Sequence, residues 1–244
     1  MKAVILCAGY GTRCYPLTKN RAKSLLPIRG RPIVEFIVRK IQLVSEVNEI
    51  YIVTNHRFYN DFKEWWESFP ATTPIKIIDD GSTNLKDKLG AIKDLIYVIE
   101  KESIQEDLLV VGGDNLFSFT INGFISFANS LRPKSLIGVY NLNGKTKANK
   151  FGVVKLDERK RVVEFHEKPA KLNGPSLVSI CLYFFPKEKL HLIGEYIQEG
   201  NDTDKIGSYL EWLTKRDEVY AYDFKGDWID VGDIDSYTEA ICSF

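Results

Sequence analysis

Strand-like and helix-like segments alternate along the first 142 residues of this chain. Strand-like apolar runs, the first of them continuous as in a strand covered on both faces, occupy residues 2–8, 49–55, 75–80, 107–114 and 135–142. Apolar residues at helical spacing fill the intervals, at residues 33–44, 58–69, 89–101 and 121–131. Such alternation is typical of parallel strands joined by right-handed crossovers. The sequence therefore predicts an α/β fold, a Rossmann-like mixed, mostly parallel sheet with helices on both faces.

After residue 145 this alternation gives way to a less regular pattern. Two strand-like segments flank the turn-like Glu158–Lys160, which predicts a β-hairpin. A long strand, two helices, a further strand and a short closing helix are expected at residues 176–186, 187–197, 205–215, 219–224 and beyond 232. No linker, low-complexity tract or internal repeat is visible in the sequence, so we expect residues 1–244 to form one domain.

The balance of charges excludes some classes of function. Lysine and arginine total 33, as do aspartate and glutamate, so the chain is formally neutral. Neutrality argues against a general nucleic-acid binder and a membrane-surface protein, and no apolar run approaches the roughly 18 residues that cross a bilayer. The four cysteines match neither a zinc pattern nor a C-x-x-C motif, which favours free thiols in a reducing compartment. We therefore expect a cytoplasmic protein that binds neither nucleic acid nor membrane.

The first 34 residues carry seven lysines and arginines but no acidic residue. Gly9 and Gly11 follow the first predicted strand, at the sheet edge where α/β proteins bind ligands. The dinucleotide pattern G-x-G-x-x-G fails because position 14 is cysteine, and the P-loop pattern fails because no glycine stands at the required distance before Lys23. A hydride-transfer enzyme and a P-loop ATPase are both disfavoured.

A phosphate-binding loop of another kind remains. Glycine lets backbone N–H groups approach phosphate oxygens closely, as a turn through Gly9 and Gly11 would. Arg13 follows as a forked donor for two oxygens, and Lys23 can add a point charge. A solvated basic loop is the alternative, but such a loop has no need of a tight glycine turn after a buried strand. The segment therefore predicts a cradle for a polyphosphate.

The stretch G-Y-G-T-R-C-Y-P-L-T, followed by Lys23 and L-L-P-I, resembles the signature of the sugar-1-phosphate nucleotidyltransferases, and fits best the glucose-1-phosphate thymidylyltransferase-like group. The resemblance runs from residue 2 to about residue 240. It implies the nucleotide-diphospho-sugar transferase fold, with a nucleotide-binding half at about residues 1–115 and a sugar-phosphate-binding half at about residues 116–244. It also implies catalytic roles for Arg13 and Lys23, although Ala22 replaces the proline that usually precedes the lysine.

The same resemblance implies which residues bind the nucleotide. They are Leu6, Ala8, Gly9, Gly11, Thr12 and Gly90. Gly90, in K-L-G-A-I, is the counterpart of a glycine under the base in G-L-A-Q-A, but the glutamine of that pattern is missing. This departure leaves the choice of base open.

Transfer of a nucleotidyl group usually requires Mg²⁺ held by carboxylates, so aspartates at strand ends are candidates. Asp114, in V-V-G-G-D, resembles the G-D metal ligand of the family, and the pattern W-x-D-x-G selects Asp230 as the second ligand. Asp233, where the family usually has threonine, is better explained as a cap for the last helix. Ser236 and Glu239, in S-Y-T-E, are a second candidate for that cap.

The resemblance also implies a site for the phosphate acceptor. The family carries E-K-P where this chain has Glu167 and Lys168, and R-Y-G-V-V where it has Gly152. A glycine of the sugar-pocket strand is replaced by Cys181. The implied ligands are the sugar phosphate for these residues and Mg²⁺ for the two aspartates.

The resulting hypothesis is an Mg²⁺-dependent nucleotidyltransferase that converts NTP and a sugar 1-phosphate to NDP-sugar and pyrophosphate by in-line displacement. Its partners would be these two small molecules, and self-association into a homo-oligomer is left open. Two alternatives remain: the same chemistry on a non-sugar phosphate such as phosphocholine, a polyol phosphate or inositol phosphate, and a non-catalytic nucleotide-binding regulatory homologue.

Overall fold

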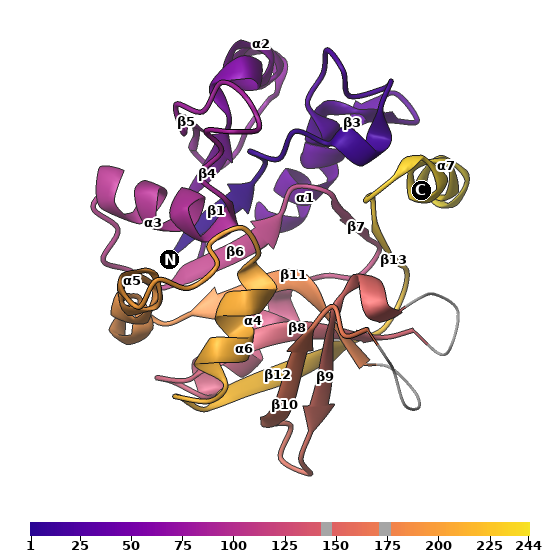
Figure 1. The fold of residues 1–244 in the computed structure, drawn as a ribbon. Coiled ribbons are helices and arrows are strands. Elements are labelled where there is room, and N and C mark those ends of the chain that lie inside the picture. The colour runs from indigo at the N-terminus through magenta and orange to yellow at the C-terminus, as the bar shows by residue number, and fades with distance from the viewer. Residues whose placement is uncertain (143–147, 171–176) are drawn as a thin grey trace.

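A nine-stranded mixed sheet forms the centre of the computed structural model, which describes residues 1–142, 148–170 and 177–244 (Figure 1). The strands follow the order β10-β9-β11-β6-β1-β4-β5, and β8 pairs with both β11 and β12. Their bounds are β1 Lys2–Leu6, β4 Glu49–Thr54, β5 Ile75–Asp79, β6 Leu108–Gly112, β8 Ser135–Asn141, β9 Gly152–Leu156, β10 Val162–Glu167, β11 Leu177–Phe185 and β12 Val219–Phe224.

The strands from the regular first part of the sequence form the parallel half of the sheet. β1 pairs in parallel with β4 and β6, and β4 pairs in parallel with β5. Leu6, the last residue of β1, lies opposite Val53 and Gly112. Because parallel strands end at the same edge, the loops after β1, β5 and β6 come together there, which is where ligands bind in such sheets.

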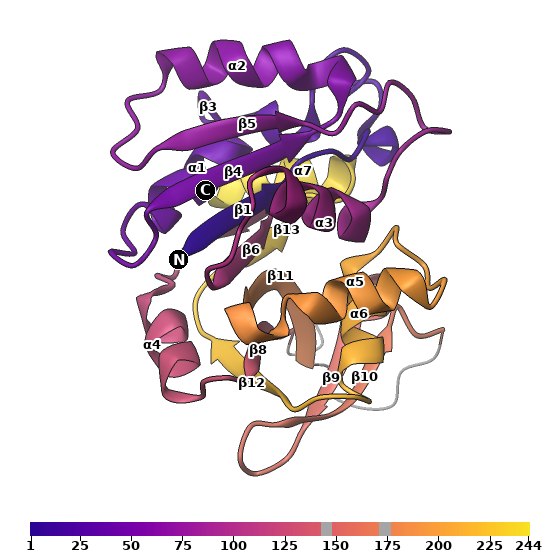
Figure 2. The same cartoon turned by 90° about the vertical axis from the view of Figure 1, so that its left-hand side faces the viewer.

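The second half of the chain adds antiparallel pairings. β11 is antiparallel to β6, β8 and β9, whereas β12 is parallel to β8. The start of β11 pairs with β9 and its end pairs with β6, so this one strand joins the two parts of the sheet. The predicted hairpin is present as β9 and β10 and projects at the end of the molecule remote from α2 (Figures 1 and 2).

Helices cover both faces of the sheet, as the alternation predicts. Their bounds are α1 Ile33–Ile41, α2 Tyr59–Ser68, α3 Ala91–Lys101, α4 Asn122–Ser130, α5 His191–Gln198, α6 Ile206–Leu213 and α7 Ile234–Ser243. One hydrophobic core contains residues of α1, α2, α4 and α7, and another contains residues of α3, α5 and α6. Successive residues of β1 alternate between them, since Ala3 and Ile5 belong to the first core and Val4 to the second.

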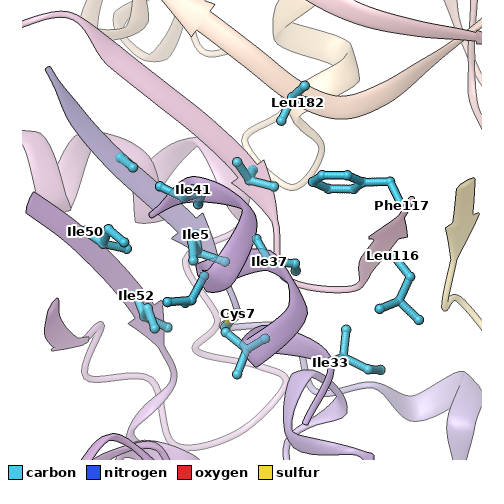
Figure 3. Close-up of a cluster of buried hydrophobic side chains, with 14 of the residues drawn as sticks. Ile5, Cys7, Ile33, Ile37, Ile41, Ile50, Ile52, Leu116, Phe117 and Leu182 are labelled. Carbon is cyan, nitrogen blue, oxygen red and sulfur yellow. The ribbon is translucent and has the colours of Figure 1, made fainter. Parts of the chain in front are cut away.

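Isoleucines dominate the packing of the first core near the site. Figure 3 shows Ile33, Ile37 and Ile41 of α1 on the side of the helix that faces the sheet. Ile5 of β1 and Ile52 of β4 lie opposite them, and all five are fully buried. These four-residue spacings in the helix and the alternate positions in the strands are the periodicities that the sequence displays.

Two short antiparallel ribbons, which the sequence does not predict, complete the strands. β2 Pro27–Ile28 pairs with β3 Arg31–Pro32, beside the C-terminal helix α7 (Figure 1). β7 Asn115–Phe117 pairs with β13 Trp228–Asp230, although more than 100 residues separate them in sequence. The described residues also include five 3-10 helices: η1 Thr12–Cys14, η2 Lys23–Leu25, η3 His56–Phe58, η4 Ala148–Lys150 and η5 Lys187–Lys189.

The cap of α7 follows one of the two sequence predictions. Asp233 is the N-cap residue, and its carboxylate accepts a hydrogen bond of 3.0 Å from the backbone N–H of Ser236. Ser236 Oγ in turn accepts from the N–H of Asp233, which completes a capping box. The alternative box at Ser236–Glu239 is therefore wrong, because Ser236 is already inside the helix. Within the described part of the chain, no helix has the length and apolar character needed to cross a membrane.

Candidate active site

The loop after β1 forms a tight turn at the carboxyl edge of the sheet. Gly11 has a φ of 63°, in the left-handed region that favours glycine, and its carbonyl accepts a 2.7 Å hydrogen bond from Thr18 Oγ1. A Cβ at Gly11 would lie 3.2 Å from the side chains of Thr18 and Lys23, whereas a Cβ at Gly9 would meet nothing within 4 Å. Gly9 therefore presents open backbone, and Gly11 allows the chain to turn into η1 and Arg13.

This loop lines a cavity of about 270 Å³. All six residues predicted to bind nucleotide line it: Leu6, Ala8, Gly9, Gly11, Thr12 and Gly90. Gly90 precedes α3 with a φ of 87°, and a Cβ there would lie 2.6 Å from the carbonyl oxygen of Thr203. Both its backbone conformation and this close approach require glycine.

A second cavity, of about 700 Å³, adjoins the first. Ala91 and Asp204 line both cavities, and the consecutive residues Thr12 and Arg13 line one cavity each. The larger cavity is lined by six more of the predicted site residues: Arg13, Asp114, Gly152, Glu167, Lys168 and Asp230. The remaining one, Lys23, reaches this group through Asp114, since Lys23 Nζ lies 2.5 Å from Asp114 Oδ2.

The β7–β13 ribbon brings Asp114 and Asp230 together. Asn115 lies opposite Asp230 in this ribbon, and the backbone N–H of Val231 donates to the carbonyl of Asp114 at 2.9 Å. The ribbon is further fixed by Trp228, whose Nε1 donates to Asn115 Oδ1 at 2.7 Å. Asn115 Nδ2 then donates to Asp114 Oδ1 at 2.9 Å. This support was missed from the sequence, in which Asn115 and Trp228 carry no separate signal.

Arg13 lies close to the Asp230 carboxylate, because both side chains lie beside Gly232. A Cβ at Gly232 would lie 3.1 Å from Asp230 Oδ2 and 3.4 Å from a guanidinium nitrogen of Arg13. Gly232 therefore leaves room for a carboxylate and a guanidinium that both face the larger cavity. The structure thus gathers two carboxylates and two cations, Lys23 and Arg13, from four separate segments of the chain.

The carboxylates of this group do not titrate alike. Burial would lower the pKa of Lys23, but the charges of Asp114 and Asp230 outweigh it and raise the pKa. Burial would raise the pKa of Asp114, but the Lys23 ammonium outweighs it and lowers the pKa. Burial, reinforced by the charge of Asp114, raises the pKa of Asp230 to about 7. Negative charge is therefore in excess at Asp230, where an added cation would be stabilising.

This donor set fits Mg²⁺. Among the described residues, no group of three or more His, Cys, Asp or Glu side chains forms a complete metal site. Mg²⁺ prefers oxygen ligands and is usually held by one or two carboxylates together with substrate phosphates and water. Asp114 and Asp230 supply that number of carboxylates, next to a loop built for phosphates.

The far wall of the larger cavity carries the residues predicted to bind the acceptor. Glu167 ends β10, and its carboxylate contacts Gly207 in the first turn of α6. Burial raises the pKa of Glu167, against the charge of Lys168, whose Nζ lies 3.7 Å from Glu167 Oε1. A Cβ at Gly152 would lie 2.5 Å from the ring of Phe165 and 3.3 Å from Glu167, so glycine is needed there.

Other residues in the cavities were not singled out from the sequence as binding residues. Asp80 and Asp94 line the smaller cavity, and Lys150, which forms a 2.9 Å ion pair with Asp233, lines the larger one. The available signal for Asp94 in the sequence was its position, as an aspartate among the apolar residues of the helical pattern at residues 89–101. Cys181, noted from the sequence only as a departure from the family pattern, is half-buried in the larger cavity.

A glycine loop at the carboxyl edge of a Rossmann-like sheet, beside two adjoining cavities, is typical of α/β enzymes that bind their ligands at this edge. A family model described as nucleotidyl transferase matches residues 2–244. The chain therefore belongs to the nucleotidyl transferase family, which confirms the resemblance seen in the sequence.

Individual relatives agree with this assignment. The chain is 28% identical over 232 residues to a bifunctional protein GlmU of Methanocaldococcus jannaschii, covering 95% of this chain and 51% of that protein. It is 28% identical over 265 residues to a glucose-1-phosphate adenylyltransferase of Rhodopirellula baltica, covering 97% of this chain and 58% of that protein. The chain thus spans about half the length of the curated relatives it matches.

A solved structure shares the fold. A crystal structure from Bacillus anthracis, described as a glucose-1-phosphate thymidylyltransferase in complex with a sucrose, superimposes with a TM-score of 0.83 at 24% identity. The match covers 99% of this chain and 94% of that chain. The predicted fold class, a mixed and mostly parallel sheet with helices, is thereby confirmed.

Proposed function

We propose that this protein is a sugar-phosphate nucleotidyltransferase, which converts NTP and a sugar 1-phosphate to NDP-sugar and pyrophosphate. The observation that carries the proposal is the pair of adjoining cavities. One is lined by the glycine loop and the other by Arg13, Asp114, Glu167, Lys168 and Asp230, while Ala91 and Asp204 line both. Such a site can hold two phosphate-bearing substrates side by side.

The reaction would be a direct displacement at the α-phosphorus of the nucleotide. An oxygen of the sugar phosphate forms a bond to the α-phosphorus, the bond from that phosphorus to the β-phosphate oxygen breaks, and pyrophosphate leaves. The attacking oxygen is already an anion at neutral pH, so no general base is required. The work of the protein is to align the two substrates and to balance their negative charge.

Arg13 and Lys23 are suited to that charge balance. Arg13 is exposed to the larger cavity at the end of the glycine turn, where its fork can hold oxygens of the leaving pyrophosphate. Lys23 is held by Asp114, which lines the larger cavity, and can contact the α-phosphate. Asp114 and Asp230 would hold Mg²⁺, which when bound would neutralise phosphate charge and favour departure of pyrophosphate.

The acceptor would occupy the larger cavity. Lys168 projects from the end of β10 with a φ of 47°, and its ammonium would bind the phosphate of the sugar. Glu167, half-buried beside Gly152, can accept hydrogen bonds from sugar hydroxyls. We accordingly assign the nucleotide to the half at about residues 1–115 and the sugar phosphate to that at about 116–244, with Asp204 of the second half also lining the nucleotide cavity. The free thiols of the cysteines suit a reducing cytoplasm.

The test is pyrophosphate release with Mg²⁺ across the common NTPs and a panel of sugar 1-phosphates. We expect release with at least one pair, and mass spectrometry should identify the matching NDP-sugar. Absence of product with every acceptor, in a folded protein that still binds nucleotide, would contradict the proposal and favour the non-catalytic homologue.

One observation supports a non-sugar acceptor as the second candidate. α7 presents Asp233, Asp235 and Glu239 to the larger cavity, and the aromatic rings of Phe151 and Trp228 line it as well. Carboxylates and aromatic faces together favour a cationic group such as an alkylammonium. Phosphocholine therefore belongs in the same assay, and product from it alone would establish this second candidate.

A further inference from the structure

Four buried polar side chains form a connected group at the smaller cavity. Tyr10, Asp80, Ser82 and Asp94 are 5%, 8%, 3% and 5% exposed, respectively. Tyr10 Oη donates to Ser82 Oγ at 3.4 Å, and Ser82 donates to Asp80 Oδ1 through both its N–H and its hydroxyl, each at 2.7 Å. Tyr10, Asp80 and Asp94 also line the cavity itself. The cavity therefore has a built polar wall that runs from Tyr10 of the glycine loop to Asp94 of α3.

Asp94 ends this series of groups without a complete set of partners. It lies in the first turn of α3, between the core residues Ile92 and Leu95. Its carboxyl forms a hydrogen bond with the carboxyl of Asp80. Burial is the largest cause that raises the pKa of Asp94 to about 8, and the charge of Asp80 is the second. The two carboxyls therefore share one proton at neutral pH. Within the described residues, Asp94 Oδ1 is buried and has no hydrogen-bond donor.

Packing of α3 does not explain this arrangement. A buried carboxyl is costly unless it is paired, and within the described ranges neither Asp80 nor Asp94 forms an ion pair with lysine or arginine. A serine, alanine or leucine at position 94 would fill the same turn without that cost. Asp94, by contrast, lines a ligand cavity and carries a buried acceptor without a donor, which suits it to a donor that the ligand supplies.

We propose that Asp94, together with Asp80, contacts the base of the bound NTP and selects bases that carry an exocyclic amino group. This inference rests on the proposed function, because it takes the smaller cavity to be the nucleotide site. An amino group has two N–H donors, so it can donate to both carboxyls at once. Rotation of Asp94 about χ2, which is broad and nearly two-fold, brings either oxygen to the cavity.

Uracil and thymine are poorly matched to the same wall. They present a carbonyl oxygen where cytosine or adenine presents an amino group, and that oxygen would face two carboxyls. A hydrogen bond to Asp80 is among the causes of the raised pKa of Asp94, so the Asp94 proton is directed at Asp80 and not at a carbonyl of the base. Cytosine, adenine and guanine all carry the amino group, and the choice among them is an outcome of the test.

The test is calorimetric binding of CTP, ATP, GTP, UTP and TTP to the whole chain in the presence of Mg²⁺. At least one of the three amino-bearing nucleotides should bind roughly tenfold or more tightly than UTP and TTP. This is the degree of discrimination that one good polar contact to a base provides. Asp94→Asn keeps the shape of the side chain but adds an N–H₂ donor. It should reduce that preference by roughly tenfold.

Asp61→Asn is the matched control. Asp61 lies in the first turn of α2, as Asp94 does in α3, and lines neither cavity, so its variant should keep the wild-type preference. Thermal unfolding of both variants verifies that they fold. Binding of the five nucleotides to the wild-type protein tests the inference even if a variant does not fold. If UTP or TTP binds as tightly as the best amino-bearing nucleotide, the inference is wrong while the proposed function stands. If no nucleotide binds, both are wrong.

Discussion

The ammonium nitrogen of Lys23 lies 2.5 Å from Oδ2 of Asp114, across 91 positions of sequence. The pair links the basic N-terminal segment to the loop after β6, at the wall of the larger cavity. Lys23 therefore has a defined position before any substrate arrives. A group that is held in place and aimed at developing negative charge is the most effective form of electrostatic catalysis.

Replacement of Lys23 by methionine should lower kcat by about 100- to 1,000-fold, the usual cost of losing one such donor at a reacting centre. It should also leave Asp114 without its cation, which destabilises the site. Pyrophosphate release and thermal unfolding measure the two effects. Lys19→Met is the control, because Lys19 belongs to the same basic segment but is exposed and lines neither cavity. Equal activity of the two variants would remove Lys23 from the mechanism.

Removal of divalent cations should abolish turnover, and Mg²⁺ should restore it. Asp114→Asn and Asp230→Asn should each raise the Mg²⁺ concentration for half-maximal rate and reduce the maximal rate, because one of two carboxylate ligands is lost. Asp227→Asn, in the same segment but exposed and outside both cavities, should behave as wild type. Activity that persists in excess chelator would refute the metal assignment.

The fold was largely predictable, because its elements depend on local periodicity. The continuous apolar run at β1 and the helical spacing of α1 and α3 specify buried elements without knowledge of their neighbours. The place of β11 was not predictable. Its residues show that it is a buried strand, but its insertion beside β6, antiparallel to it, depends on the pairing of segments that are remote in sequence.

The candidate site, like the fold, was predictable only in part. Family patterns marked Asp114 and Asp230 separately, and the structure shows what joins them, the three-residue strands of the β7–β13 ribbon. Strands this short carry no periodic signal. Asp94 was missed for the opposite reason: it lies within a strong helical pattern, where a charged residue is normally assigned to the exposed face.

Gly152→Ala should weaken binding of the acceptor and leave binding of the nucleotide unchanged. The new Cβ would lie 2.5 Å from Phe165 and would displace either that ring or Glu167, at the wall of the larger cavity only. We expect KM for the acceptor to rise with little change in KM for NTP, and a loss of stability of about 1–3 kcal/mol from overpacking.

Gly194→Ala provides the comparison for that substitution. Gly194 lies within α5, where a Cβ would meet nothing within 4 Å. Alanine should therefore stabilise the protein by about 0.5–1 kcal/mol and leave both KM values unchanged. A rise in KM for NTP at Gly152→Ala would mean that the two cavities are not independent sites.

The shared proton of Asp80 and Asp94 predicts how stability depends on pH. Burial and the charge of Asp80 raise the pKa of Asp94 to about 8 in the folded protein, whereas an unfolded aspartate has a pKa of about 3.9. Between these values the folded state binds more protons than the unfolded state, so this contribution to stability is complete below about pH 4 and is lost as the pH rises towards 8. One such proton changes the free energy of unfolding by up to about 1.4 kcal/mol per pH unit.

Urea unfolding of wild type and Asp94→Asn between about pH 5 and pH 8 measures the difference. The variant should lose stability less steeply as the pH rises, because the amide does not titrate. Parallel curves would mean that Asp94 is ionised in the folded protein and that the two carboxyls do not share a proton.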